Sequence, residues 1–123
     1  MNVEMTHHID ASEPDERGLY SYFYEYDLYT FSDGPTSYIA RSYADTPTEA
    51  HFLKRRRGSR ETLLCARDLQ EPMFAEALAY LGAAGKSELK WLSEKTGYIS
   101  ISIAGADAPP VGKGFWSYIW RRR

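Results

Sequence analysis

The chain has 123 residues, of which 43% are hydrophobic and 26% charged, values typical of one globular domain with its own core. Its net charge of −2 is too small to indicate a nucleic-acid or membrane partner, and its single cysteine cannot form an internal disulfide. It has no apolar run near the roughly 20 residues of a membrane span, and residues 1–18 lack the features of a signal peptide. We therefore expect a cytoplasmic protein without metal or cofactor.

The charges are unevenly distributed along the chain. Residues 1–50 hold ten acids and two bases, whereas residues 51–123 hold thirteen bases and seven acids. Such asymmetry indicates either an acidic and a basic face or two halves that attract each other within one sheet. We favour the second interpretation.

Residues 1–17 are polar and acidic and show no sustained period, so we expect a flexible N-terminal arm before a single domain over residues 18–123. From Leu19 to Phe31 aromatic and apolar residues alternate with a period of two, which predicts a strand. Its even-numbered residues, four of them tyrosines, would point to one face. Tyr29 would point to the other.

Turn-forming residues separate the next alternating runs. Gly, Pro, Asp and Ser recur between them at a spacing of about ten residues, as in an antiparallel meander. The runs predict further strands at residues 36–44, 49–55 and 61–66.

The period then changes to that of a helix. Asp68 and Glu71 have the spacing of a capping box, with Asp68 as the expected N-cap. One apolar helix face follows, formed by Phe74, Ala77, Leu78 and Leu81. Two more strands are predicted after it, at residues 87–92 and 98–105, with the isoleucines of the second facing the core.

These elements predict an α+β domain. We expect a mainly antiparallel sheet of order β-β-β-β-α-β-β with one helix packed on one face. A loop is expected at residues 106–114, and whether a further strand follows it is left open.

The excess of aromatic residues is the main functional lead. Tyrosine suits protein interfaces because it offers apolar area and a hydrogen-bonding tip. Neighbouring acids would repel phosphate, which disfavours a nucleic-acid platform, and an ordinary half-buried strand is the simpler interpretation. The interaction residues expected for a protein partner or a homodimer are Tyr20, Tyr22, Tyr24, Tyr26, Glu25, Asp27, Trp116 and Trp120.

A concentrated run of basic residues supports an alternative. At a hairpin tip it could straddle phosphates, a contact that ignores sequence, although a solvated turn that protects a sheet edge is the simpler interpretation. The residues of this alternative nucleic-acid site are Lys54, Arg55, Arg56, Arg57, Arg60, Arg121, Arg122 and Arg123.

Catalytic motifs do not appear in the sequence. Gly-rich phosphate loops, nucleophile elbows and histidine or cysteine spacings typical of zinc sites are all missing. The sequence therefore predicts a non-catalytic protein-interaction module, immunity-like or adaptor-like, with a nucleic-acid-associated domain as the alternative.

Overall fold

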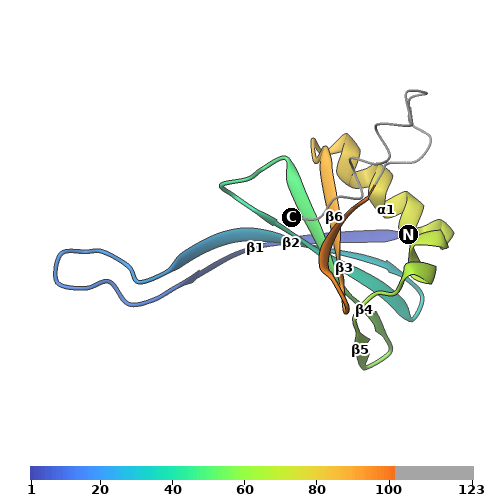
Figure 1. Cartoon of the computed structure of the whole chain (residues 1–123), viewed down its shortest axis with the longest axis horizontal. Coiled ribbons are helices and arrows are strands. Elements are labelled where there is room, and N and C mark those ends of the chain that lie inside the picture. Colours follow the sequence, from blue (N-terminus) through green and yellow to red (C-terminus); the bar gives the residue numbers. More distant parts are fainter. Residues whose placement is uncertain (102–123) are drawn as a thin grey trace.

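The computed structural model describes residues 1–101, which form one sheet with a single α-helix on one face (Figure 1). The sheet has seven strands in the order β1-β2-β3-β4-β6-β7, and β5 pairs with β4 beside this path. The strands are β1 (Asn2–Ala11), β2 (Phe23–Asp33), β3 (Thr36–Tyr43), β4 (Glu49–Arg57), β5 (Arg60–Thr62), β6 (Glu88–Ser93) and β7 (Gly97–Ile101). A 3₁₀ turn, η1 (Ala66–Gln70), leads into the helix α1 (Pro72–Ala83). The predicted α+β class and mainly antiparallel sheet are confirmed.

The expected flexible N-terminal arm contains a strand. Residues 2–11 form β1, which pairs antiparallel with β2 along its whole length. Residues 2–11 show no apolar alternation because most side chains of β1 are exposed on both faces of the strand. The strand is held by its ladder with β2 rather than by burial.

The meander also ends earlier than predicted. Residues 61–66 were expected to form a full strand, but β5 has three residues, and Leu64 makes only an isolated bridge to Ser93. The segment with η1 and α1 then crosses over the sheet, so that β6 pairs with β4 in parallel. Two neighbouring strands can run parallel only when a crossover connection of this kind joins them.

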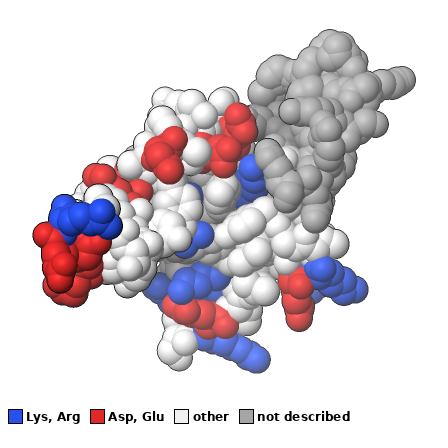
Figure 2. All heavy atoms as spheres, turned by 60° about the vertical axis from the view of Figure 1, so that its left-hand side comes forward, with Lys and Arg blue, Asp and Glu red and all other residues white. Residues whose placement is uncertain are grey.

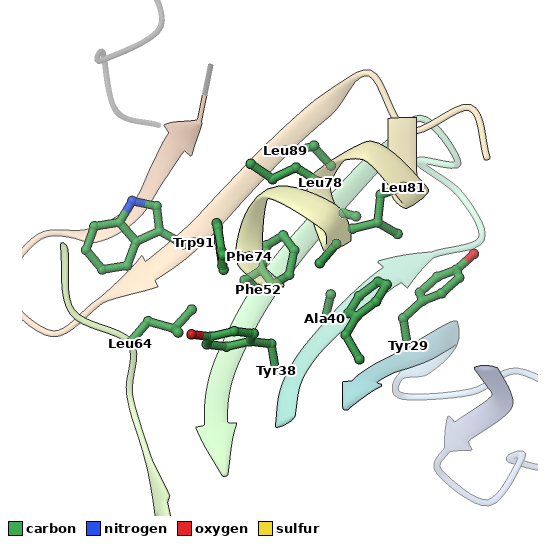
Figure 3. Packing of buried hydrophobic residues seen from close by; sticks show 13 residues of the cluster. Tyr29, Tyr38, Ala40, Phe52, Leu64, Phe74, Leu78, Leu81, Leu89 and Trp91 are labelled. Carbon is green, nitrogen blue, oxygen red and sulfur yellow. The ribbon is translucent and has the colours of Figure 1, made fainter. Parts of the chain in front are cut away.

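The core lies between α1 and one face of the sheet (Figure 3). The predicted helix stripe of Phe74, Ala77, Leu78 and Leu81 is buried, as expected. The ring of Phe74 lies 4.5 Å from that of Phe52 and 5.3 Å from that of Tyr38. These rings fill the space where the helix crosses the strands, and burial of their apolar surface stabilises the fold.

The start of the helix differs from the prediction. Glu71 occupies the N-cap position and Pro72 the first turn, whereas Asp68 lies one element earlier, buried in η1. There its carboxylate accepts hydrogen bonds from the Cys65 amide and from Arg55. Within residues 1–101 no helix is long and apolar enough to cross a membrane.

Candidate protein-interaction surface

The hairpin of β1 and β2 extends well beyond the rest of the sheet (Figure 1). Strand β3 pairs with β2 only from Tyr26 onward, so the part nearer the turn is a two-stranded ribbon. We call residues 9–25 the hairpin arm. Asp15 organises its turn by accepting hydrogen bonds from the amides of Arg17 and Leu19, and Gly18 adopts a φ of 82° that favours glycine.

The hairpin arm is both aromatic and acidic. It holds five acidic residues and one basic residue, and acidic side chains gather around a basic one at the left end of the surface in Figure 2. Six of its large side chains are each about half exposed. They are Ile9, Leu19, Tyr20, Tyr22, Phe23 and Tyr24. Such a group of exposed large apolar and aromatic side chains on one projection is typical of a contact surface.

Four tyrosines form a continuous row on the sheet face opposite the helix. We call Tyr22, Tyr24, Tyr26 and Tyr43 the tyrosine cluster. The ring of Tyr24 lies 6.0 Å from that of Tyr22 and 5.9 Å from that of Tyr43, and Tyr43 lies 5.8 Å from Tyr26. Ring separations in this range are favourable contacts, so the row is ordered before any partner binds.

A hollow of about 150 Å³ lies where the arm leaves the sheet. Its lining residues include the aromatic Phe23, Tyr24 and Tyr43 and the acidic Glu25 and Asp45. The amide of Ala44 donates a hydrogen bond of 2.8 Å to the carbonyl of Glu25, which fixes the turn after β3 against β2. Aromatic faces beside carboxylates favour a cation.

The tyrosine cluster continues into a half-buried polar group. The guanidinium of Arg41 lies 4.7 Å from the ring centroid of Tyr43, and its Nη2 donates to the Tyr98 hydroxyl at 3.3 Å. The Tyr98 ring lies 4.8 Å from His51, whose Nε2 lies 3.1 Å from Glu49. Burial is the largest cause that lowers the pKa of His51, and the nearby Lys90 and Arg41 lower it further. This group stiffens the base of the cluster.

On the helix side of the sheet, His7 bridges two acids of β2. Its Nδ1 lies 2.7 Å from Asp27 and its Nε2 lies 2.9 Å from Glu25. The hydrogen bond to Asp27, followed by that to Glu25, raises the pKa of His7. The predicted interaction residues Glu25 and Asp27 therefore hold the two strands of the hairpin together, on the face away from the tyrosines.

Strand alternation divides the basic run between several partners. Lys54 lies 3.0 Å and Arg56 3.3 Å from Glu61 across the β4–β5 turn. On the other face, Arg55 pairs with Asp68 at 2.8 Å, and Arg57 donates to the Thr36 hydroxyl. Two acids, Glu61 and Asp68, thus pair with three of these bases, and the bases are divided between two faces. Both effects weaken a phosphate-binding patch, because such binding depends on charge free to replace counterions.

The structure separates the predicted interaction residues into groups. Tyr22, Tyr24 and Tyr26 lie together, whereas the ring of Tyr20 turns back onto Phe23 at 5.2 Å because the chain there belongs to the turn and not to β2. Trp116, Trp120 and residues 121–123 lie outside the described residues. Tyr43 and Asp45, which also line the hollow, were not among the predicted interaction residues. An aromatic residue at the end of β3, followed directly by a turn, is the sequence feature that could have indicated them.

Comparisons of the chain with protein-family models, curated proteins and solved structures found no match. Within residues 1–101 no three His, Cys, Asp or Glu side chains are grouped so that they could hold a metal ion. The function of this surface is therefore inferred from the side chains that form it.

Proposed function

We propose that the protein is a non-catalytic interaction module that binds a basic segment of another protein through its hairpin arm. The observation that carries the proposal is the row of tyrosines, of which Tyr22 and Tyr24 are exposed, beside the acidic residues of a projecting ribbon. Tyrosines supply large contact area at low entropic cost, since only two side-chain torsions are fixed on binding.

The hollow beside Asp45 suits one lysine or arginine side chain of that partner. A cation over an aromatic ring gains about 0.5–2 kcal/mol, depending on how far it is desolvated. Tyr24, Tyr43 and Asp45 line this hollow, so a cation there would meet aromatic surface and one carboxylate, whereas the Glu25 carboxylate is turned to His7 on the other face. The acids of the turn would steer a basic partner toward the arm over a longer range.

In the cell this module acts as an immunity-like or adaptor-like protein that blocks or bridges its partner, and it resides in the cytoplasm. A projecting ribbon can enter a concave surface that a flat sheet cannot reach. The basic segment proposed here as the partner has the charge that matches the acidic arm.

A titration with defined peptides tests this proposal. The isotope-labelled full chain is titrated with a hexa-arginine peptide and with a hexaglutamate peptide while amide shifts are recorded by NMR. We expect the arginine peptide to shift the amides of Tyr24, Ala44 and Asp45, with an affinity that weakens as salt is added. The glutamate peptide should leave them in place.

The matched variants are Asp45→Lys and Glu76→Lys, since both residues are exposed and both substitutions change the charge by the same amount. Asp45→Lys should remove the response at the hollow, and Glu76→Lys, on the outer face of α1, should preserve it. Equal loss in the two variants, or no response to the arginine peptide, would refute the proposal.

A further inference from the structure

Within the part of the chain that the structure describes, strand β1 forms one edge of the sheet. Within residues 1–101 it pairs with β2 on one side and with no strand on the other. Its ten residues contain no proline, lysine or arginine, and its register with β2 has no shift. Exposed edges are usually shortened, bulged or guarded by lysine and proline, because their free backbone groups can pair with another chain.

The ladder determines which backbone groups of β1 face outward. The Ser12 amide bonds to the Tyr22 carbonyl and the Ala44 amide to the Glu25 carbonyl, which sets the alternation of bonds in both neighbouring ladders. Antiparallel partners alternate between bonded and non-bonded pairs. The even-numbered residues of β1 therefore bond to β2, and the odd-numbered residues present N–H and C=O groups to the free edge.

We propose that a second copy of this chain pairs with this edge, so that two β1 strands run antiparallel about a two-fold axis at Thr6. In this register Val3 faces the partner's Ile9, and Met5 faces the partner's His7. Glu4 faces the partner's His8, which sets a carboxylate opposite an imidazole. Each odd-numbered pair exchanges two backbone hydrogen bonds.

The two neighbouring registers that also place the outward N–H and C=O groups of both strands opposite each other are less favourable. A shift that centres the axis on His7 places Glu4 opposite Asp10, and like charges directly opposite destabilise a strand pair. A shift that centres it on Met5 places Val3 opposite His7 and leaves Ile9 opposite the chain end. The Thr6 register alone among the three matches an apolar pair and a complementary polar pair.

The pairing also covers exposed apolar surface. The side chains of Met5 and Ile9 are 52% and 59% exposed and lie on the helix side of the sheet, because they share a face with Val3, opposite Phe31. A two-fold axis perpendicular to the sheet keeps both helices on this side. Ile9 of each copy then packs on the partner's Val3, which is half-buried against the core.

The apolar side chains that meet across this edge lie on the face opposite the tyrosine cluster, whereas His8 stacks on Tyr26 of the cluster. The hairpin arm beyond residue 11 projects past the end of the paired strands. A dimer joined at β1 would therefore present two hairpin arms pointing in opposite directions. Each arm would remain open to a basic partner.

Disulfide cross-linking tests the register. In a Cys65→Ser background, which removes the exposed native thiol, Thr6→Cys and Ile9→Cys are compared after mild oxidation. Non-bonded antiparallel pairs have Cα atoms about 4.5 Å apart, within disulfide range. We expect Thr6→Cys to cross-link almost completely and Ile9→Cys, which faces Val3, to remain largely unlinked.

Proline substitution tests the backbone contribution. The full chain should have about twice its mass of 14.1 kDa by light scattering at micromolar concentration. Met5→Pro removes an outward N–H that β2 does not use, so the dimer should dissociate while circular dichroism keeps the sheet signal. Met5→Val keeps the N–H and should remain dimeric.

A charge exchange provides a second test that introduces no proline into the strand. Glu4→Lys should weaken the dimer tenfold or more, and adding His8→Glu should restore it. The proposal is overturned by a monomer at all concentrations, by a dimer that survives Met5→Pro, or by cross-linking of Ile9→Cys in place of Thr6→Cys. If the Met5→Pro monomer still binds the arginine peptide, the proposed function of the hairpin arm holds whether or not the dimer forms.

Discussion

The guanidinium Nη1 of Arg55 lies 2.8 Å from the carboxylate Oδ1 of Asp68. This contact ties β4 to the 3₁₀ turn that leads into α1. The side chain of Asp68 is 6% exposed, so it is a buried acid compensated by one base and by the Cys65 amide. A residue of the candidate phosphate site is thus part of the scaffold that positions the helix.

Removal of Arg55 should therefore destabilise the fold. Arg55→Met keeps much of the aliphatic stem but leaves Asp68 without its charged partner, which we expect to cost about 2 kcal/mol, since Arg55 remains partly solvated. Lys54→Met, in the exposed pair with Glu61, should cost about 0.5 kcal/mol or less. Urea unfolding measures both, and equal losses would contradict the role assigned to Arg55.

Truncation of Phe74 tests the core between helix and sheet. Phe74 is fully buried between Phe52 and Tyr38, so Phe74→Ala should lower the free energy of unfolding by about 3–4 kcal/mol. Glu76→Ala, on the exposed side of the same helix, should change it by about 0.5 kcal/mol at most. A small effect of Phe74→Ala would mean that the helix does not form this core.

The His7 bridge predicts a pH dependence in the hairpin. Because the pKa of His7 is raised in the folded state, its contribution is fully present below the unfolded value of about 6.5 and is lost as pH rises through the folded pKa. NMR titration of the ring should find this raised pKa, and Asp27→Asn should lower it. Asp45→Asn should not change it, and a His7 pKa unaffected by Asp27→Asn would contradict the bridge.

The lowered pKa of His51 predicts the opposite pH dependence of stability. Its pKa is lowered by burial, so its contribution is present above about pH 6.5 and is lost as pH falls through the unfolded value toward the folded one. His51→Gln should flatten the loss of stability on the acidic side, measured by urea unfolding between pH 7 and pH 5. His8→Gln, on the exposed hairpin, serves as the control, and an unchanged acid limb in His51→Gln would refute the assignment.

Local patterns were sufficient for much of the fold. The alternation from Phe23 to Phe31, the turns after it and the apolar stripe of α1 were all recognisable, because each reports a side chain that one neighbouring layer buries. The division of β2 into a tyrosine face and a face bearing Tyr29 and Phe31 followed from the same period. The strand β1 was missed because it is stabilised by backbone pairing and leaves no apolar signature.

Local patterns therefore indicate which residues alternate, which form a helix and which are charged. The fold decides which of these residues meet. It brought Tyr43 and Asp45 beside Tyr24 and divided the basic run between Glu61, Asp68 and Thr36. The physical reason is that strand order and register depend on long-range pairing and on the crossover through α1, neither of which is encoded in a local period.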